Sequence, residues 1–374
     1  MKSKPIPSAG PCALLLGALI ICFAKAAIAA DAAAAPYKVG VTFRQFIPPE
    51  PYDWRDASTH ALRAVVWYPA AATARETPQL IGAPQDAFAH AGDAAPEAAV
   101  ASSPARFPLI VISHGTGGAA LAMAWLGTRL AAHGFIAVAV NHPGNNGLEP
   151  YTAQGFSLWW LRAKDLSAVL DGMLADREFA PRIDARRIGA AGFSLGGHTM
   201  MGIAGGRTST AFFDLCSHQP QDPRCAAPPE FPTLVSRVVQ LFKSDPGYQT
   251  AVRAGGEDYR DPRVRAVFAI APSLAEVFVP GSLEKISIPV EIVAGSADTV
   301  IPVAANAKYV AAHVPGSRLV LFPGAGHYTF FATCTALGRK AHPELCVDAP
   351  GVDRQRIHER AASMAAAFFS EHLK

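Results

Sequence analysis

The chain has 374 residues, half of them hydrophobic and 17% charged, with 33 lysines and arginines against 30 aspartates and glutamates. This length is enough for one large or two smaller globular domains with a substantial core. A nearly balanced charge without a Lys/Arg-rich run excludes the electrostatic footprint of a nucleic-acid binder. Small, weakly charged partners fit this composition better.

The N-terminal residues have the layout of a secretory signal peptide. Two lysines precede an apolar run at 12–24, and the small-residue string A-A-I-A-A-D follows at 26–31. The run is short for a membrane span and Lys25 ends it, so a cleaved signal is favoured over a retained anchor. We expect cleavage near Ala29 or Ala30, no stable membrane anchor afterwards, and a protein that is periplasmic or secreted.

Four cysteines lie beyond this segment, in two pairs that are local in sequence. They are Cys216 with Cys225 and Cys334 with Cys346. In an exported protein this spacing favours two disulfides, although four cysteines allow three connectivities and buried free thiols are the alternative. No C-x-x-C or H-x-x-x-H spacing accompanies them, so we expect no zinc site.

Short apolar or β-branched runs alternate with longer helical runs, which predicts an α/β fold with a mostly parallel sheet. About eight strands are expected, near Tyr37–Phe43, Leu62–Tyr68, Leu109–Ser113, Ile136–Asn141, Ile188–Phe193, Val264–Ala271, Val290–Gly295 and Arg318–Phe322. Helices are expected near Ala120–His133, Leu158–Arg177, Leu195–Gly205, Val303–His313 and Arg354–His372. The first two strands follow each other without a helix, so we expect an antiparallel, hairpin-like edge.

Two stretches interrupt this alternation. Residues 70–105 are rich in Ala and Pro and are expected to form a long surface excursion. Residues 206–262 hold several prolines, two of the cysteines and one amphipathic run, P-T-L-V-S-R-V-V-Q-L-F. This second stretch is too short and irregular for a separate domain, so we expect a cap-like insertion. The expected organisation is a signal peptide over 1–29 and one domain over 30–374.

The strongest motif is G-F-S-L-G-G at 192–197, between a strand-like run and a helix-like run of small residues. A serine hydroxyl is a weak nucleophile that must stand beside a base and near groups that stabilise an oxyanion. The G-x-S-x-G elbow supplies that position, since Gly192 and Gly196 leave room for a strained strand-to-helix turn. The pattern predicts Ser194 as a nucleophile; a plain tight turn is the alternative.

A nucleophile on such an elbow is followed along the chain by an acid and then by a histidine. Asp298 comes just after the strand-like V-E-I-V-A-G, and His327 just after L-V-L-F-P-G-A-G. Both therefore lie at the carboxyl ends of strands, where α/β sheets build their sites. We expect Asp298 to accept the Nδ1–H of His327, which leaves Nε2 free to take the Ser194 proton.

Other histidines and aspartates fit these roles less well. His142 precedes the nucleophile, His114 belongs to a glycine-rich turn, and His198 lies one helical turn beyond Ser194. Asp258 and Asp261 come before a strand rather than after one.

The stretch H-G-T-G-G at 114–118 follows the strand-like L-I-V-I-S. Enzymes with the elbow place one backbone N–H of the oxyanion hole in such a stretch. We assign the two donors to the backbone N–H groups of Thr116 and Leu195. A glycine-rich turn without this role is the alternative.

Several segments together resemble the bacterial predicted dienelactone hydrolases and the plasma-type platelet-activating-factor acetylhydrolases. These are R-A-V-V-W-Y-P, F-P-L-I-V-I-S-H-G-T-G-G, L-A-A-H-G-F-I-A-V-A-V-N-H-P-G and I-D-A-R-R-I-G-A-A-G-F-S-L-G-G, with the contexts of Asp298 and His327. The likeness runs from about Leu62 to His327. It implies an α/β-hydrolase fold and an acyl-transfer esterase without metal or cofactor. True dienelactone hydrolases use a cysteine nucleophile, so Ser194 favours ordinary esters over lactones.

Apolar residues near the expected site loops suit an apolar acyl or aryl group, and a place in the core is the alternative for each. The candidates for substrate binding are Phe193, His142, Trp159 and Tyr328. The sequence thus predicts an exported serine hydrolase that cleaves small or short-acyl carboxylic esters through an acyl-enzyme. The alternatives are a lipid or polyester hydrolase, an amidase or peptidase, a lactonase, and a catalytically silent binding module on the same fold.

Overall fold

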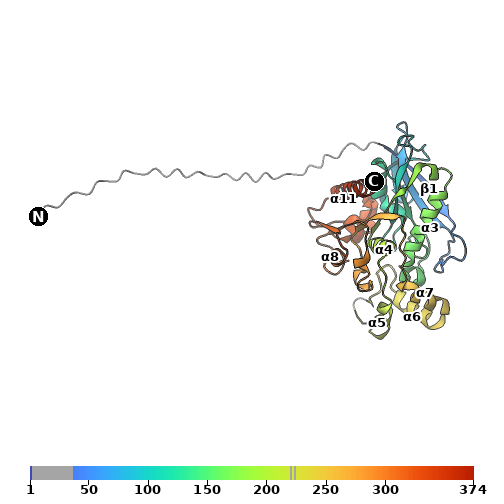
Figure 1. Ribbon diagram of the computed structural model, residues 1–374, viewed down its shortest axis with the longest axis vertical. Coiled ribbons are helices and arrows are strands. Elements are labelled where there is room, and N and C mark those ends of the chain that lie inside the picture. Colours follow the sequence, from blue (N-terminus) through green and yellow to red (C-terminus); the bar gives the residue numbers. More distant parts are fainter. Residues whose placement is uncertain (2–36, 220, 223–224) are drawn as a thin grey trace. The chain divides into compact units, whose positions relative to one another are not determined.

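The structure is a computed structural model that describes Met1 and residues 37–219, 221–222 and 225–374 (Figure 1). The expected signal-peptide segment and its cleavage site lie outside the described residues. From residue 37 onward the described chain belongs to one compact unit. None of the helices described is long and apolar enough to cross a membrane.

A parallel array forms the centre of the sheet. It consists of β5 (Phe107–Ser113), β6 (Ile136–Val140), β7 (Ile183–Phe193), β8 (Val264–Ile270), β9 (Val290–Gly295) and β10 (Arg318–Phe322). Its spatial order is β10-β9-β8-β7-β5-β6. All residues of β5, β6 and β9 are buried, as expected for parallel strands covered by helices on both faces.

An antiparallel part continues the sheet beyond β6. β2 (Leu62–Ala70) pairs antiparallel with β6, and β1 (Lys38–Phe46) pairs antiparallel with β2. β4 (Ala89–Pro96) adds to β1, and β3 (Thr77–Ile81) and β11 (Thr333–Cys334) pair with β4. The first two strands are therefore antiparallel as expected, but they do not form an edge.

The expectation of about eight, mostly parallel strands is wrong, because the described chain holds an 11-stranded mixed sheet. Each of the eight expected strands is present, and the other three are β3, β4 and β11. β4 reads A-H-A-G-D-A-A-P, without β-branched residues, so its composition gives no strand signal. Ala89, Ala91 and Ala94 are nevertheless fully buried. Residues 70–105 were expected to form a surface excursion, but they contribute two strands, β3 and β4, to the sheet.

Helices cover both faces of the sheet (Figure 1). α1 (Ala124–Ala132) packs against α11 (Arg354–His372), while α3 (Leu161–Ala175) packs against α4 (Leu195–Ala204), and α8 (Ala307–His313) lies beside β9 and β10. Small residues allow close approach: a Cβ on Gly127 of α1 would lie 2.2 Å from the Trp67 ring of β2. Such close packing is what fixes these helices on the sheet.

Residues 206–262 were expected to be irregular apart from one run, but the part of this stretch that the structure describes contains three α-helices. These are α5 (Ala211–His218), α6 (Leu234–Ser244) and α7 (Pro246–Arg253). Figure 1 shows them close together at the bottom of the view. α6 is the amphipathic run noted in the sequence. A disulfide joins Cys216 of α5 to Cys225.

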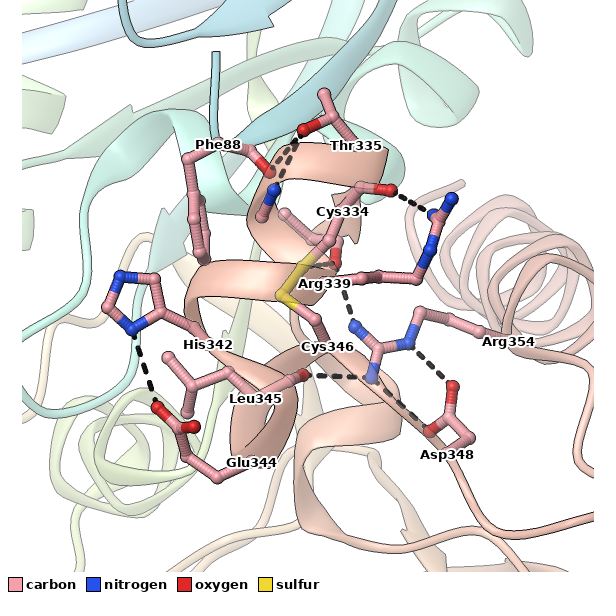
Figure 2. Close-up of a disulfide and its surroundings, with 12 residues drawn as sticks. Phe88, Cys334, Thr335, Arg339, His342, Glu344, Leu345, Cys346, Asp348 and Arg354 are labelled. Atoms are coloured by element: carbon pink, nitrogen blue, oxygen red, sulfur yellow. Dashed lines mark hydrogen bonds and ion pairs between the residues drawn. A yellow bond between two sulfur atoms is a disulfide. The ribbon is translucent and has the colours of Figure 1, made fainter. Parts of the chain in front are cut away.

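A second disulfide-bonded excursion follows β10. It contains β11, α9 (Ala336–Ala341) and α10 (Pro343–Cys346), and Figure 2 shows Cys334 of β11 joined to Cys346 of α10. Arg354, the first residue of α11, donates to the carbonyl oxygens of Ala332 and Leu345 and to the Asp348 carboxylate. The disulfide closes the excursion on itself, and the Arg354 guanidinium ties it to α11.

Candidate active site

Ser194 stands on the sharp turn between β7 and α4. Its φ of 57° and ψ of −117° are rare for a residue with a side chain. The Ser194 N–H donates to the Ile270 carbonyl at 2.8 Å, which ties the turn to β8. A Cβ on Gly192 would lie 2.3 Å from the Gly196 carbonyl oxygen, and one on Gly196 would lie 2.0 Å from that of Ser113. The glycines are therefore required by the backbone packing of the turn.

The structure brings Ser194, His327 and Asp298 together. The His327 Nε2 lies 2.9 Å from the Ser194 Oγ, and its Nδ1 lies 2.7 Å from the Asp298 Oδ2. All three residues are buried, at 8%, 4% and 6% exposure respectively. With Nδ1–H donated to the carboxylate, Nε2 is the unprotonated nitrogen that faces the serine hydroxyl. This is the arrangement in which an imidazole acts as base toward a serine.

Local bonds hold the acid and the histidine in place. The backbone N–H of Ile301 donates to the Asp298 Oδ1 at 2.7 Å, so both carboxylate oxygens are engaged. His327 begins a short 3-10 helix, His327–Phe330, in which the Gly326 N–H donates to the Thr329 Oγ1. The Thr329 hydroxyl in turn donates to the Asp348 carboxylate at 2.7 Å. The His327 turn is thereby tied to the disulfide-bonded excursion of Figure 2.

The loop 114–118 lies against the serine turn. A Cβ on Gly115 would lie 3.2 Å from the Cβ of Ser194, and Thr116 and Leu195 both line the cavity that Ser194 lines. Leu195 is the first residue of α4, where the N–H groups have no partner within the helix. The placement is compatible with the two expected oxyanion donors, whose role stays a prediction.

Beneath this loop lies a buried charged network. The Asp165 carboxylate accepts from Arg55 Nη2 at 2.8 and 2.9 Å, from the Tyr52 hydroxyl at 2.6 Å and from His142 Nδ1 at 2.7 Å. The His142 Nε2 lies 2.8 Å from the Ser113 Oγ. The contacts among Ser113, His142 and Asp165 thus repeat those among Ser194, His327 and Asp298. All three of these side chains are buried, however, and none lines the cavity in front of Ser194.

The network has a fixed charge state. Burial is the largest single influence on Asp165 and favours its neutral form, but the Arg55 guanidinium and the contact with His142 together outweigh it and bring the pKa of this carboxyl down to about 2. Burial, assisted by the Arg162 charge, lowers the pKa of His142 to about 3 despite the contact with Asp165. A neutral His142 therefore bridges an ionised Asp165 and the Ser113 hydroxyl at the base of the loop.

His142 was expected to bind substrate, and the structure corrects this. Both of its ring nitrogens are engaged inside the fold, at 1% side-chain exposure. It supports the loop instead, since its backbone N–H donates to the His114 Nε2 at 3.3 Å. The Arg162 guanidinium also donates to the His114 carbonyl, at 2.6 Å.

Arg55, Arg162 and Asp165 of this network were not predicted from the sequence. A signal existed for two of them. Arg162 and Asp165 lie three residues apart on the apolar face of a predicted helix, where an unpaired charge is costly.

A cavity of about 1330 Å³ opens in front of Ser194. Of the expected binding residues, Phe193, Trp159 and Tyr328 line it. Tyr328 is half-buried, and burial together with the nearby Glu230 carboxylate raises the pKa of its hydroxyl. Within the described residues no cluster of three or more His, Cys, Asp or Glu side chains could hold a metal ion.

Known proteins share segments of this sequence. Residues 98–217, which include Ser194 but neither Asp298 nor His327, match a family described as PET hydrolase-like. The chain is 38% identical to the cutinase est2 of Thermobifida alba over 100 residues, which is 26% of this chain and 30% of that protein. It is 34% identical to lipase 1 of Moraxella sp. (strain TA144) over 87 residues, or 23% of this chain and 24% of the lipase. These matches span less than a third of either relative.

A solved structure matches far more of the chain. The ferulic acid esterase from Streptomyces cinnamoneus superimposes with a TM-score of 0.59 and 21% identity, over 92% of both chains. At this identity the likeness concerns the fold. Together with the order of the central strands and the serine turn between β7 and α4, it shows that the chain has the α/β-hydrolase fold.

Proposed function

We propose that the protein is a serine hydrolase that cleaves carboxylic esters through an acyl-enzyme. The observation that carries this proposal is the line of contacts from Ser194 Oγ to His327 Nε2 and from His327 Nδ1 to Asp298, at the floor of a cavity. The cutinase, lipase and esterase named among the similar proteins support ester hydrolysis. The resemblance to predicted dienelactone hydrolases and platelet-activating-factor acetylhydrolases belongs to the same proposal.

In the proposed mechanism His327 takes the hydroxyl proton as the Ser194 Oγ bonds to the ester carbonyl carbon. The backbone N–H groups of Thr116 and Leu195 donate to the oxyanion. The C–O bond to the alcohol then breaks, and the alcohol leaves with the proton from His327. A water molecule, deprotonated by His327, attacks the acyl-enzyme, and the acid leaves as Ser194 regains its proton. Asp298 keeps His327 in the required tautomer throughout.

A polyester is a second candidate substrate, because residues 98–217 match the PET hydrolase-like family. Hydrolysis of a polyester requires the same acyl transfer, at an ester bond in a chain end or a loop of the polymer. Release of soluble acid from a polyester film by the purified protein, measured beside a soluble ester, would separate the two.

We also propose that the protein is exported. Its two disulfides, Cys216–Cys225 and Cys334–Cys346, are of a kind that persists in oxidising compartments. Expression of the full chain followed by N-terminal sequencing should give a mature start near Ala30 or Asp31, and an intact N-terminus in the cell pellet would contradict export.

Hydrolysis of p-nitrophenyl butanoate by the purified protein tests the function. Wild type should release p-nitrophenol, and Ser194→Ala should lose at least about 10³-fold in kcat. Ser113→Ala is the matched control, since Ser113 also contacts a His–Asp pair but does not line the cavity. Turnover that survives in Ser194→Ala, or that is lost equally in both variants, would overturn the assignment.

A further inference from the structure

The cavity in front of Ser194 is large for a short-acyl ester. Pockets of about 300–1,000 Å³ enclose most of a drug-sized molecule. At about 1330 Å³, this cavity exceeds that range. An acetyl or butanoyl group would leave most of its wall in contact with water.

One wall of the cavity is the apolar face of α6. Leu234, Val235, Val238, Val239 and Phe242 recur at helical spacing and line the cavity. The apolar stripe of a surface helix is normally covered by the core. In α6 no residue is buried, and Val239 and Phe242 are 38% and 44% exposed. The described chain therefore leaves part of this stripe open toward the cavity.

A further exposed apolar group lines the cavity outside α6. Val300 follows Asp298 by two residues, is 48% exposed and lines the same cavity. Three of the large exposed apolar side chains of the described chain thus border one cavity. Gathered exposed apolar groups of this kind mark ligand-binding surfaces.

Aromatic side chains continue the apolar surface between α6 and the serine. The Trp159 ring stacks on Phe213 with centroids 5.7 Å apart and meets Phe212 edge-on at 5.8 Å. All three line the cavity together with Phe193 and Leu195, which flank Ser194. An extended apolar group could therefore follow one continuous surface from α6 to the reacting carbonyl.

The charged groups on the lining indicate what kind of chain fits. They include Glu230, Glu276 and Glu344, beside Lys243 at the end of α6. A predominantly acidic lining gives no advantage to an anionic group. An uncharged apolar chain is the occupant that both the apolar walls and these carboxylates favour.

We propose that α6 and Val300 form the binding surface for a long, uncharged apolar chain of the ester, so that the protein prefers long-chain esters to acetates. This inference rests on the proposed function, because the chain is defined by its ester bond at Ser194. Each methylene taken from water into the cavity raises kcat/KM about fourfold, which corresponds to about 0.8 kcal/mol. The gain ends where the chain outgrows the wall.

A series of p-nitrophenyl esters from acetate to decanoate, kept below their aggregation limits, tests the preference. A parallel series of alkyl acetates tests the alcohol side. We expect kcat/KM to rise at least 100-fold (about fourfold per methylene at first) between acetyl and octanoyl or between methyl and octyl. A flat response in both series would overturn the inference.

Substitutions on α6 test which surface binds the chain. Phe242→Ser and Val239→Ser should lower the octanoate-to-acetate ratio of kcat/KM, by about tenfold for Phe242→Ser. Phe43→Ser is the matched control, because Phe43 on β1 is 62% exposed and does not line the cavity. It should leave the ratio unchanged. A ratio that stays the same in Phe242→Ser would contradict the role of α6.

Binding of dodecan-2-one, which has no ester bond, separates this inference from the proposed function. In Ser194→Ala protein the ketone should bind and change the tryptophan fluorescence, since Trp159 lines the cavity. Adding Phe242→Ser should weaken this binding at least about fivefold. Binding without any ester turnover would refute the proposed function alone. The opposite result would be ester turnover whose kcat/KM does not depend on chain length, together with ketone binding that Phe242→Ser leaves unchanged. That result would refute this inference alone.

Discussion

Ser194 holds a backbone conformation, φ 57° and ψ −117°, that side chains disfavour at a cost of order 1–3 kcal/mol. The cost is retained because this conformation directs the Oγ toward the His327 Nε2 at 2.9 Å. The surrounding backbone enforces it through the bond to Ile270 and the close approach of Gly196 to Ser113. The strain lies in the Ser194 backbone and the reactivity in its Oγ, so substitutions can change one without the other.

Replacing Ser194 by Gly and by Ala should separate them. Both changes remove the nucleophile, but only glycine relieves the positive φ. We expect Ser194→Gly to be more stable than Ser194→Ala by about 1 kcal/mol, measured by urea unfolding. Equal stabilities would show that the turn is not strained.

Asp298 acts in this account only through His327. Asp298→Asn would replace an acceptor by an amide that favours the wrong tautomer of the imidazole, so kcat should fall about 10³–10⁴-fold. The measurement is the steady-state hydrolysis of p-nitrophenyl butanoate, with circular dichroism to verify folding. A fall of less than about tenfold would point to a different acid.

Among the elements, the excursion after β10 supports the site through the His327 turn. Thr329 of that turn bonds to Asp348, and Arg354 bonds to Asp348 as well (Figure 2). The Cys334–Cys346 disulfide closes the excursion across a sequence separation of 12 residues. In the unfolded chain such a link removes conformational freedom.

The double variant Cys334→Ser and Cys346→Ser should lose about 3 kcal/mol of stability. Urea unfolding without reductant measures it, and wild type in reductant gives the comparison. No loss of stability would mean that the Arg354 bonds and the pairing of β11 with β4 hold the excursion without the disulfide.

The central strands and α11 were predictable because their residues carry the signal themselves. β5 to β10 contain short apolar or β-branched runs, and the helical pattern gives α11 with its observed bounds, Arg354–His372. β4 was missed because its alanines become a strand only through the neighbours that bury them. The helices α5 and α7 were missed because prolines and cysteines around them favour irregular structure.

The contacts among Ser194, Asp298 and His327 were predictable from the order of these residues along the chain, but other contacts near the site were not. Ser194, Asp298 and His327 follow three strands that end at one edge of the sheet, so the topology brings them together. Arg55 and Asp165 meet from segments 110 residues apart, and neither belongs to a motif. The volume of the cavity depends on how α6 is placed, which its own sequence does not specify.

At the scale of the whole molecule, buried histidines link stability to pH. Burial is the largest cause that lowers the pKa of His142 to about 3 and the pKa values of His198 and His358 to about 4. In the unfolded chain each takes a proton near its ordinary pKa of about 6.5. As the pH falls below 6.5 the unfolded state therefore binds more protons, and the folded state loses stability toward pH 4.

Removing one of these histidines should reduce that dependence. His358→Gln should lower the slope of the unfolding free energy against pH by about 1.1 kcal/mol per pH unit between pH 6 and pH 4.5. The slope is measured by urea unfolding at several pH values, so a constant loss of stability from the substitution does not affect it. An unchanged slope would mean that His358 is protonated in the folded state.

The proposed activity requires one reactive serine among the serines of the chain. Labelling with a fluorophosphonate, followed by peptide mass mapping, tests it most directly. We predict one adduct, on the peptide that contains Ser194, and no adduct when Ser194 is replaced by Ala or when the protein is unfolded before labelling. An unlabelled native protein, or an adduct on another serine, would contradict the assignment of Ser194, His327 and Asp298 as the catalytic triad.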